Sequence, residues 1–374
     1  ASAAPRERRE RDRGARRPRG AAPPARGSFV PSVPSRVLIP YFAGHAYAFS
    51  GLFRRMGHDA RVLPLPGAES RALGEKHSLG KECHAFSMIA GDLLRVARDP
   101  DATGGVFDFP GTSIPCLLHE YGRGMEALLR EFGIEGVRVS SPSGEELIRA
   151  FGIDALDRLY VGILAIELLV KAACQTRPYE LERGRTDEVH RRNLARIEAA
   201  VASGDTFEAL AESLASLDRA GLLASGAVAL RRAVDVLRVR SVVGSRVARR
   251  EEPGYLEMRR LVGPYMPNEA HELLFVNVAK IVDFARGGAD GVVNAICFGC
   301  MVGNASAAVI ERIRRDYDYV PIVTAVYSWA DDPSRRMVLE AFVAQVKAHA
   351  GRRRAAVPAS LGERLQRLAG RVRG

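Results

Sequence analysis

Five cysteines are the residues in this sequence best suited to chemistry: Cys83, Cys116, Cys174, Cys297 and Cys300. They are few for a chain of 374 residues and odd in number, which favours a reducing compartment over a disulfide-stapled secreted protein. Three of them, Cys83, Cys116 and Cys300, fall in loops that we expect between a strand and the helix that follows it. A thiol at the amino end of a helix is favoured as the thiolate. We therefore expect these three cysteines to be metal ligands.

Thiolates prefer zinc or iron–sulfur clusters to magnesium or calcium. Three protein ligands would leave one iron of a [4Fe–4S] cluster open to water or substrate, as an open position does in catalytic zinc sites. The spacing itself is weak evidence, because the ligands are 33 and 184 residues apart and no two of them form a CxxC pair. The alternative is that they are small, buried and inert thiols. We expect Cys174 and Cys297 to be of that kind, one on an apolar helix and the other inside a strand.

Elements of two kinds must position the three thiols. Short β-branched runs predict strands over Arg36–Ile39, Arg61–Leu65, Gly105–Phe109 and Gly136–Val139, and again over Gly291–Ile296 and Pro321–Tyr327. Helical patterns predict helices near 45–56, 85–98, 116–132, 268–286, 304–317 and 334–349. Strands that alternate with helices indicate parallel sheets covered on both faces. Ligands of such sheets bind at the carboxyl ends of the strands.

The expected fold class is therefore α/β, with parallel, doubly wound (Rossmann-like) sheet units and an inserted helical region. The expected domains are a disordered basic tail over 1–30, a first α/β unit over 31–150 with two cluster cysteines, a helical region over 151–255, a second α/β unit over 256–350 with the third cysteine, and a basic tail over 351–374.

The net charge of +11 comes from the two ends of the chain. Residues 1–27 and residues 351–374 each carry a net charge of +6, which leaves −1 for the residues between them. Without a basic and aromatic stripe, we do not expect the folded part to bind nucleic acid. The sequence contains neither a run of apolar residues long enough for a bilayer nor a secretory signal, so we expect a cytoplasmic protein without membrane contact.

Several short motifs resemble the 2-hydroxyacyl-CoA dehydratase-like family, which includes the 2-hydroxyglutaryl-CoA dehydratase D-component and the C-terminal region of CoA-substrate-specific enzyme activases. The motifs, in order, are Leu73-Gly74, Ser78-Leu79-Gly80-Lys81-Glu82-Cys83, Gly91-Asp92, Pro110, Pro115-Cys116, Tyr121-Gly122, Thr176-Arg177-Pro178-Tyr179-Glu180, Gly288-Ala289-Asp290-Gly291, Phe298-Gly299-Cys300-Met301 and Val320-Pro321-Ile322-Val323. They extend over most of residues 36–349, and they look nearest to the activase-like group.

This resemblance implies that Cys83, Cys116 and Cys300 ligate one [4Fe–4S] cluster, or part of a double-cubane cluster. Dehydratases of this type eliminate water from 2-hydroxyacyl-CoA after an ATP-dependent activator supplies one low-potential electron, and related proteins reduce small molecules. The resemblance thus implies a lyase or reductase component, an activator protein or domain as partner, acyl-CoA as a candidate substrate, and pairing with a second copy or a paralogous subunit. The chain has no phosphate-binding loop of its own for ATP.

Two departures from the family pattern leave other functions open. The second motif reads Ile114-Pro115-Cys116-Leu117 where activase-like relatives usually have Gly-Pro-Cys-Arg, and the stretch between Glu180 and Tyr265 is too short for the usual α/β unit. A non-catalytic docking module, detached from a larger activase or reductase, is the first alternative. The start at Ala1 rather than Met agrees with a detached segment. A structural zinc protein that uses the same thiolates is the second.

Overall fold

The computed structural model describes residues 30–31, 34–78, 82–112, 116–203, 205–220, 253–267, 269–270, 272–328 and 333–356. The tail predicted over 1–30 lies outside these residues except for Val30, and so does the second tail from residue 357 onward. The last helix, predicted to end near residue 349, continues to Ala356 and so extends into the predicted tail.

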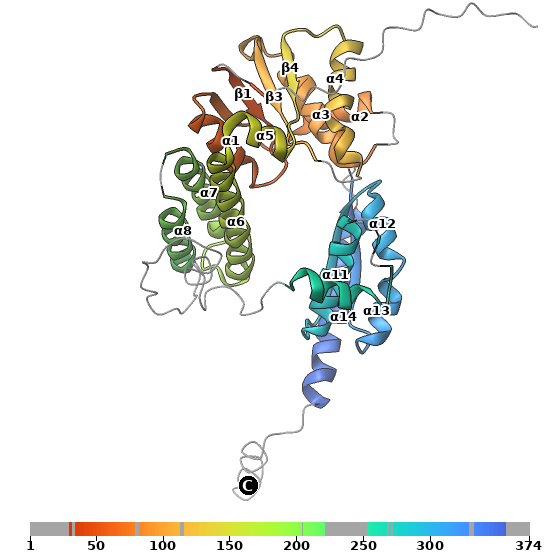
Figure 1. Ribbon diagram of the computed structural model, residues 1–374. Helices are drawn as coiled ribbons and strands as arrows, with labels where there is room; N and C mark the ends of the chain where they lie inside the picture. Colours follow the sequence, from red (N-terminus) through yellow and green to blue (C-terminus); the bar gives the residue numbers. More distant parts are fainter. Residues whose placement is uncertain are drawn as a thin grey trace, which may run out of the picture.

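The first sheet has four parallel strands in the order β2-β1-β3-β4 (Figure 1). The strands are β1 (Arg36–Ile39), β2 (Asp59–Val62), β3 (Gly105–Asp108) and β4 (Val137–Ser140). The predicted parallel arrangement is confirmed, but β2 begins two residues and ends three residues earlier than the predicted Arg61–Leu65, and β4 lies one residue later than predicted. Parallel strands need crossover connections, and a helix follows each strand here.

Helices cover both faces of this sheet. They are α1 (Ala46–Arg55), α2 (Ala68–His77), α3 (His84–Val96), α4 (Tyr121–Glu131) and α5 (Gly144–Phe151), with a short 3₁₀ helix, η1 (Pro100–Ala102), before β3. Side chains alternate between the two faces: Leu38 and Phe107 pack with residues of α3 and α4, whereas Val37 and Ile39 pack with Phe53 of α1. The near-continuous burial of β1 and β3 is the pattern of a parallel sheet with two covered faces.

Helix α2 has no counterpart among the predicted helices, and it packs closely along α3. A Cβ atom on Gly74 would overlap the Ser87 carbonyl, and one on Gly91 would overlap the Ser70 carbonyl. The two glycines therefore allow an approach that no other residue permits. Across the same contact, Ser70 donates a hydrogen bond to the buried Asp92 at 2.6 Å.

We expect Gly91→Ala to lower the free energy of unfolding by roughly 3 kcal/mol, the upper end of the range for overpacking, because the obstructing atom is backbone rather than a side chain. Urea denaturation of the full chain measures this loss. Gly144→Ala is the matched control, since a Cβ there meets no atom within 4 Å and alanine favours the helix. Equal stability of the two variants would contradict the close packing of α2 on α3.

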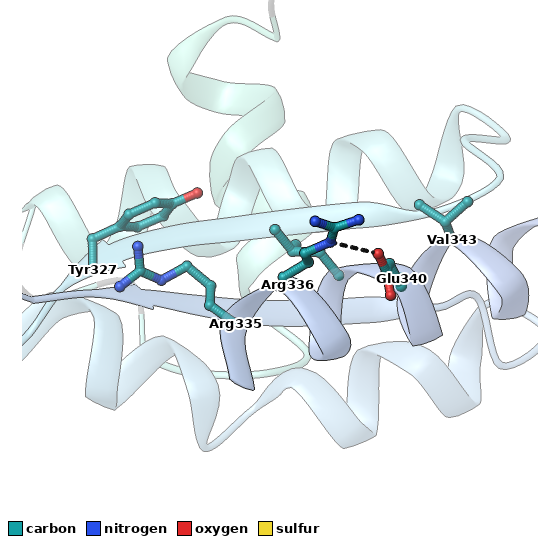
Figure 2. A pocket seen from close by; sticks show the side chains of 6 residues that line it. Tyr327, Arg335, Arg336, Glu340 and Val343 are labelled. Atoms are coloured by element: carbon teal, nitrogen blue, oxygen red, sulfur yellow. Dashed lines mark hydrogen bonds and ion pairs between the residues drawn. The ribbon is translucent and has the colours of Figure 1, made fainter. Parts of the chain in front are cut away.

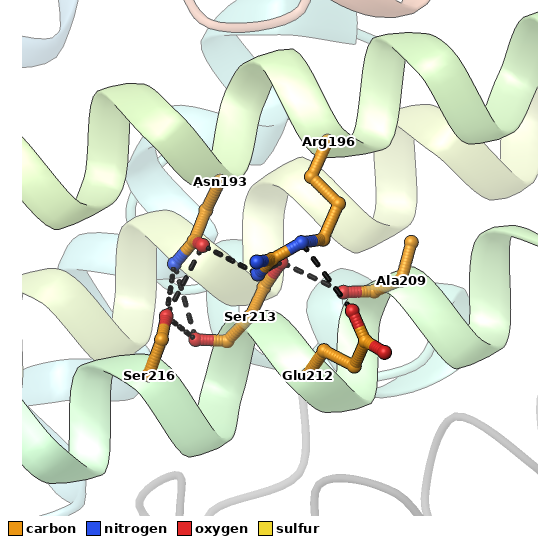
Figure 3. A network of polar contacts seen from close by, with 6 residues as sticks. All are labelled: Asn193, Arg196, Ala209, Glu212, Ser213 and Ser216. Atoms are coloured by element: carbon orange, nitrogen blue, oxygen red, sulfur yellow. Dashed lines mark hydrogen bonds and ion pairs between the residues drawn. The ribbon is translucent and has the colours of Figure 1, made fainter.

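Residues after α5 form long helices: α6 (Ile153–Thr176), α7 (Arg185–Ser203) and α8 (Thr206–Ala220), with the 3₁₀ helix η3 (Arg177–Tyr179) between the first two. Their core includes Ile166, Leu169 and Ile197, and it also takes in Leu52 of α1. Figure 3 shows the polar contacts that join α7 to α8. The Asn193 amide donates to the Ser213 carbonyl at 3.1 Å and to the Ser216 hydroxyl at 2.9 Å, while the Arg196 guanidinium lies 3.4 Å from the Glu212 carboxylate.

The chain then returns to alternating helices and strands. The elements are α10 (Tyr255–Val262), α11 (Glu272–Arg286), β5 (Val292–Cys297), α12 (Met301–Ala307), α13 (Ile310–Asp316), β6 (Ile322–Tyr327) and α14 (Pro333–Ala356), and β5 pairs in parallel with β6. The single helix predicted over 304–317 is wrong, because two short helices occupy it. The Ser306 hydroxyl donates to the Gly303 carbonyl at 2.9 Å and accepts from Asn294, which favours an interruption there.

Among the described residues, no helix combines the length and the apolar composition needed to cross a bilayer.

Candidate functional site

The two α/β parts meet where β5 ends and α3 begins (Figure 1). The backbone N–H of His84 donates to the carbonyl of Phe298 at 3.0 Å. Gly299 has a positive φ of 74°, and a Cβ atom there would lie 3.3 Å from the Cα of Cys83. A glycine is favoured at this position both by the left-handed backbone and by the close approach of the Cys83 loop.

Each of the three predicted ligands stands immediately before a helix, as the sequence predicts. Cys83 precedes α3, Cys300 precedes α12, and Cys116 precedes η2 (Leu117–Glu120), a 3₁₀ helix that leads into α4. The Cys300 sulfur accepts a hydrogen bond from the Gly303 backbone N–H at 3.3 Å. All five cysteines of the chain are free thiols.

Cys83 lies at the centre of the junction. Its side chain is buried at 7% exposure, and its sulfur lies 2.6 Å from the hydroxyl of Tyr121, the first residue of α4. The Tyr121 ring packs against the rings of Phe86 and Phe109, with centroids 5.1 and 5.5 Å away. The thiol is therefore enclosed by aromatic side chains and has one phenol directed at it.

Hydrogen bonds hold the pKa of the Cys83 thiol well below its ordinary value. The largest contribution is a hydrogen bond with Cys297; burial acts in the opposite direction, and the Tyr121 hydroxyl and the backbone N–H groups of Ala85 and Phe86 lower the pKa further. Several donors therefore converge on one sulfur, and they stabilise its thiolate. A thiolate is the form in which cysteine binds a metal.

Burial raises the pKa of Tyr121, and the hydrogen bond to Cys83 raises it further. The negative charges of Cys83, Cys297 and Cys116 add to this effect, which places all three sulfurs within electrostatic reach of the phenol. Tyr121 is consequently kept protonated as a hydrogen-bond donor among thiols. None of the contacts described for these residues joins Cys116 to Cys83.

Cys297 is the site residue that the sequence analysis missed. It is only half-buried, it packs against the core of the first α/β part, and its hydrogen bond to Cys83 raises its own pKa. The nearby charge of Cys300 raises that pKa as well. The predicted position in a strand is confirmed, and the packing against the core and the raised pKa agree with the expectation of an inert thiol. The signal was present, because Cys297-Phe298-Gly299-Cys300 has CxxC spacing.

Cys174 differs from the prediction. It is exposed on α6, with the Arg177 guanidinium 3.9 Å from its sulfur, and it is not part of the core. Helix α6 is apolar over most of its length, yet its buried face at this point is formed by Ala172, Ala173 and Thr176. None of the contacts described around Cys83 involves this cysteine, which makes it a suitable control for experiments on thiols.

A single metal ion and a cubane cluster require different spacings between the thiols. No three His, Cys, Asp or Glu side chains among the described residues are placed to hold one metal ion. A single zinc ion would need sulfurs about 4 Å apart, as follows from a Zn–S bond of ~2.3 Å in tetrahedral geometry. In a cubane cluster each cysteine binds a different iron, so the ligands stand farther apart.

A pocket of 580 Å³ lies between the end of β6 and the first turns of α14 (Figure 2). Tyr327, which lines it, pairs with Cys297 in the β5–β6 register. The Arg335 guanidinium lies 4.8 Å from the centre of the Tyr327 ring, and Arg336 donates to Glu340 at 2.8 Å. The pocket thus has an aromatic wall and two cationic side chains.

A buried carboxyl group ends β3 in the first sheet. Asp108 is fully buried, and it accepts a hydrogen bond from the Ser140 hydroxyl at 2.5 Å. Burial raises the pKa of Asp108 to about 7, although the Ser140 bond acts in the opposite direction. Its second oxygen has no hydrogen-bond partner among the described residues. Asp108 is therefore a buried acid whose charge changes near pH 7, rather than a fixed negative charge.

No protein-family model matches the chain, and no curated protein matches it.

Proposed function

We propose that this chain is an iron–sulfur protein of the 2-hydroxyacyl-CoA dehydratase type, in which Cys83, Cys116 and Cys300 ligate one [4Fe–4S] cluster. The observation that carries the proposal is the convergence on Cys83. A buried sulfur with a lowered pKa lies at the contact between two α/β parts, 2.6 Å from the Tyr121 hydroxyl and against the turn that joins Cys297 to Cys300. Doubly wound units joined by an inserted helical region would be the corresponding fold.

The residues around the thiols suit a reducible centre. Tyr121 would donate a hydrogen bond to a cluster sulfur or thiolate, which is one of the ways in which proteins set cluster potentials. The aromatic rings of Phe86 and Phe109 limit access of water from the side of the first sheet. When bound, the cluster would supply one-electron transfer chemistry, and the chain's own residues would hold it and shield it.

The pocket beside Tyr327 is the proposed location of the substrate. Its two arginines, one of which pairs with Glu340, suit a ligand with an anionic group, such as the phosphates or a carboxylate of an acyl-CoA, and the pairing of Tyr327 with Cys297 in the β5–β6 register supports this location. A separate ATP-hydrolysing activator would deliver the electron. Pairing with a second copy or a paralogous subunit belongs to the same proposal.

The test is anaerobic reconstitution of the full chain with iron and sulfide, followed by quantitation of both elements and EPR after reduction with dithionite. We expect about four iron and about four sulfide per chain, with the signal of a reduced cubane. Well-folded protein without iron would overturn the proposal, and stoichiometric zinc in anaerobically purified protein would support the structural zinc alternative.

One observation favours the alternative of a non-catalytic docking module. The described part of the second α/β region has a sheet of only two parallel strands, and Val293 and Val326 on these strands are 47% and 41% exposed. Parallel sheets usually have both faces covered, so a larger partner would complete this one. Turnover with an activator, ATP and a low-potential donor separates the two functions, because a docking module binds without consuming substrate.

A further inference from the structure

We propose that the outer edge of β6 is the surface through which two copies of this chain pair, with one β6 strand antiparallel to the other about a two-fold axis at Thr324. The inference rests on the pairing of subunits in the proposed function and specifies its surface, but no cluster is needed for it. Such a contact would join the two-stranded sheets of both copies into one sheet.

The first argument is the row of backbone groups on the outer side of β6. Strand β5 and the residue after it donate to the carbonyls of Pro321 and Tyr327 at 2.9 and 2.8 Å, and the two strands are in parallel register between these bonds. Successive residues of a strand direct their N–H and C=O groups to opposite sides, so those of Ile322, Thr324 and Val326 point away from β5. Within the described part of the chain, these groups have no hydrogen-bond partner.

The second argument is the composition and exposure of β6. Its sequence, Ile-Val-Thr-Ala-Val-Tyr, contains no charged residue, glycine or proline. Natural edge strands are normally protected from other chains by a charge, a proline or a bulge. Val326 and Tyr327 are 41% and 43% exposed, and the first three residues of the strand are only half-buried. The strand therefore lacks the usual protection and remains accessible, as a strand that pairs with a partner must be.

The third argument is that this edge is complementary to itself. With Thr324 opposite Thr324 of the second copy, Ile322 of each copy lies opposite Val326 of the other. Residues that face each other with their N–H and C=O groups in an antiparallel pair exchange two hydrogen bonds, so about six bonds would satisfy every outward group of these residues. Paired threonines and paired β-branched residues are favourable cross-strand neighbours, and no like charges meet. A second copy of this chain is thus the partner that the strand fits.

The outer edge of β5 is less suited to the same contact. The His84 N–H donates to the Phe298 carbonyl at 3.0 Å, so the loop of Cys83 stands at the end of β5. An antiparallel strand added to β5 would meet the first α/β part there. Val293 on β5 is 47% exposed, close to the value for Val326, and it therefore offers a matched control on the other strand of the same sheet.

Sedimentation velocity of the full chain over a dilution series tests the inference, and it requires no iron. We expect the unchanged chain and Val293→Lys to sediment at twice the mass of one chain. Val326→Lys should raise the dissociation constant about tenfold or more, because it sets a charge against Ile322 of the second copy. Thr324→Pro should also weaken the dimer, since it removes an outward N–H from each copy but no bond to β5.

Hydrogen exchange followed by mass spectrometry gives a second readout, on the unchanged chain. The amides of Thr324 and Val326 should exchange slowly in the dimer and rapidly after dilution, while the amide of Val293 exchanges equally in both. If circular dichroism shows that the variants do not fold, this measurement decides by itself.

The inference is overturned if the unchanged chain is monomeric throughout the dilution series, if Val326→Lys dimerises as tightly as the unchanged chain, or if the β6 amides exchange at the same rate in dimer and monomer. Dissociation caused by Val293→Lys alone would place the contact on β5 and overturn it as well. A monomer that binds about four iron would defeat only this inference, whereas a dimer that binds no iron would defeat only the proposed cluster.

Discussion

A full chain carrying Cys83→Ser should assemble no iron–sulfur cluster under conditions in which Cys174→Ser assembles as much as the unchanged protein. Cys83 is the buried sulfur on which Tyr121, Cys297 and the backbone of α3 converge, so its loss removes the centre of the group. Iron and sulfide per chain should fall at least tenfold, from about four toward background. Mutation of a residue that only supports a metal ligand already lowers metal affinity by about 10- to 100-fold, so removal of a direct ligand should cost at least as much.

The control is informative because Cys174 is the cysteine that the structure places away from these contacts, exposed on α6. We expect Cys116→Ser and Cys300→Ser to resemble Cys83→Ser. Circular dichroism distinguishes loss of the cluster from loss of the fold. Full cluster content in Cys83→Ser would remove this residue from the ligand set, and equal loss in Cys174→Ser would show that the iron is bound nonspecifically.

The second large effect is a dependence of stability on pH that originates in Asp108. Burial raises the pKa of this carboxyl group to about 7 in the folded chain, against 3.8 for an unperturbed aspartate. The unfolded chain therefore releases this proton at lower pH than the folded chain does. The contribution of Asp108 to stability is fully present below the ordinary pKa, falls as the pH rises from about 4 to about 7, and is constant above that. The difference of about three pKa units corresponds to roughly 4 kcal/mol.

Asp108→Asn should remove that dependence, because the amide stays neutral and its oxygen can still accept from Ser140. Urea denaturation between pH 4 and pH 8 should show similar stability for the variant and the unchanged chain at pH 4, and a growing advantage for the variant up to pH 7. Glu126→Gln, which changes an exposed carboxyl group on α4, is the matched control and should follow the unchanged chain. Parallel curves for Asp108→Asn and the unchanged chain would contradict the raised pKa.

Local sequence was sufficient for most elements of the two sheets. The β-branched runs of β1 and β3 are short and bounded by glycine, proline or polar residues, and the structure places both strands within one residue of the prediction. The same reasoning placed the three cysteines in strand-to-helix loops near the starts of helices, since such a loop is recognised from its neighbours alone.

Helix α2 shows where such reasoning fails. Only Ser70, Leu73 and Gly74 are buried in it, so it lacks the apolar stripe by which an amphipathic helix is recognised. Its position depends on two glycines that allow α2 and α3 to touch, and a glycine inside a helix reads as an unfavourable residue until its neighbour is known. Packing, rather than propensity, decides that this segment is helical.

What the amino-acid sequence determined by itself is the alternation of strands and helices, the parallel sheet, and the place of Cys83, Cys116 and Cys300 at the starts of helices. These features depend on residues a few positions apart. Only the tertiary structure decided that the turn after β5 meets the loop of Cys83 and that Cys174 is exposed. The first is a contact between residues more than 200 positions apart, made when two separately patterned sheets dock, and the second depends on which face of α6 its neighbours cover; neither is encoded in local periodicity.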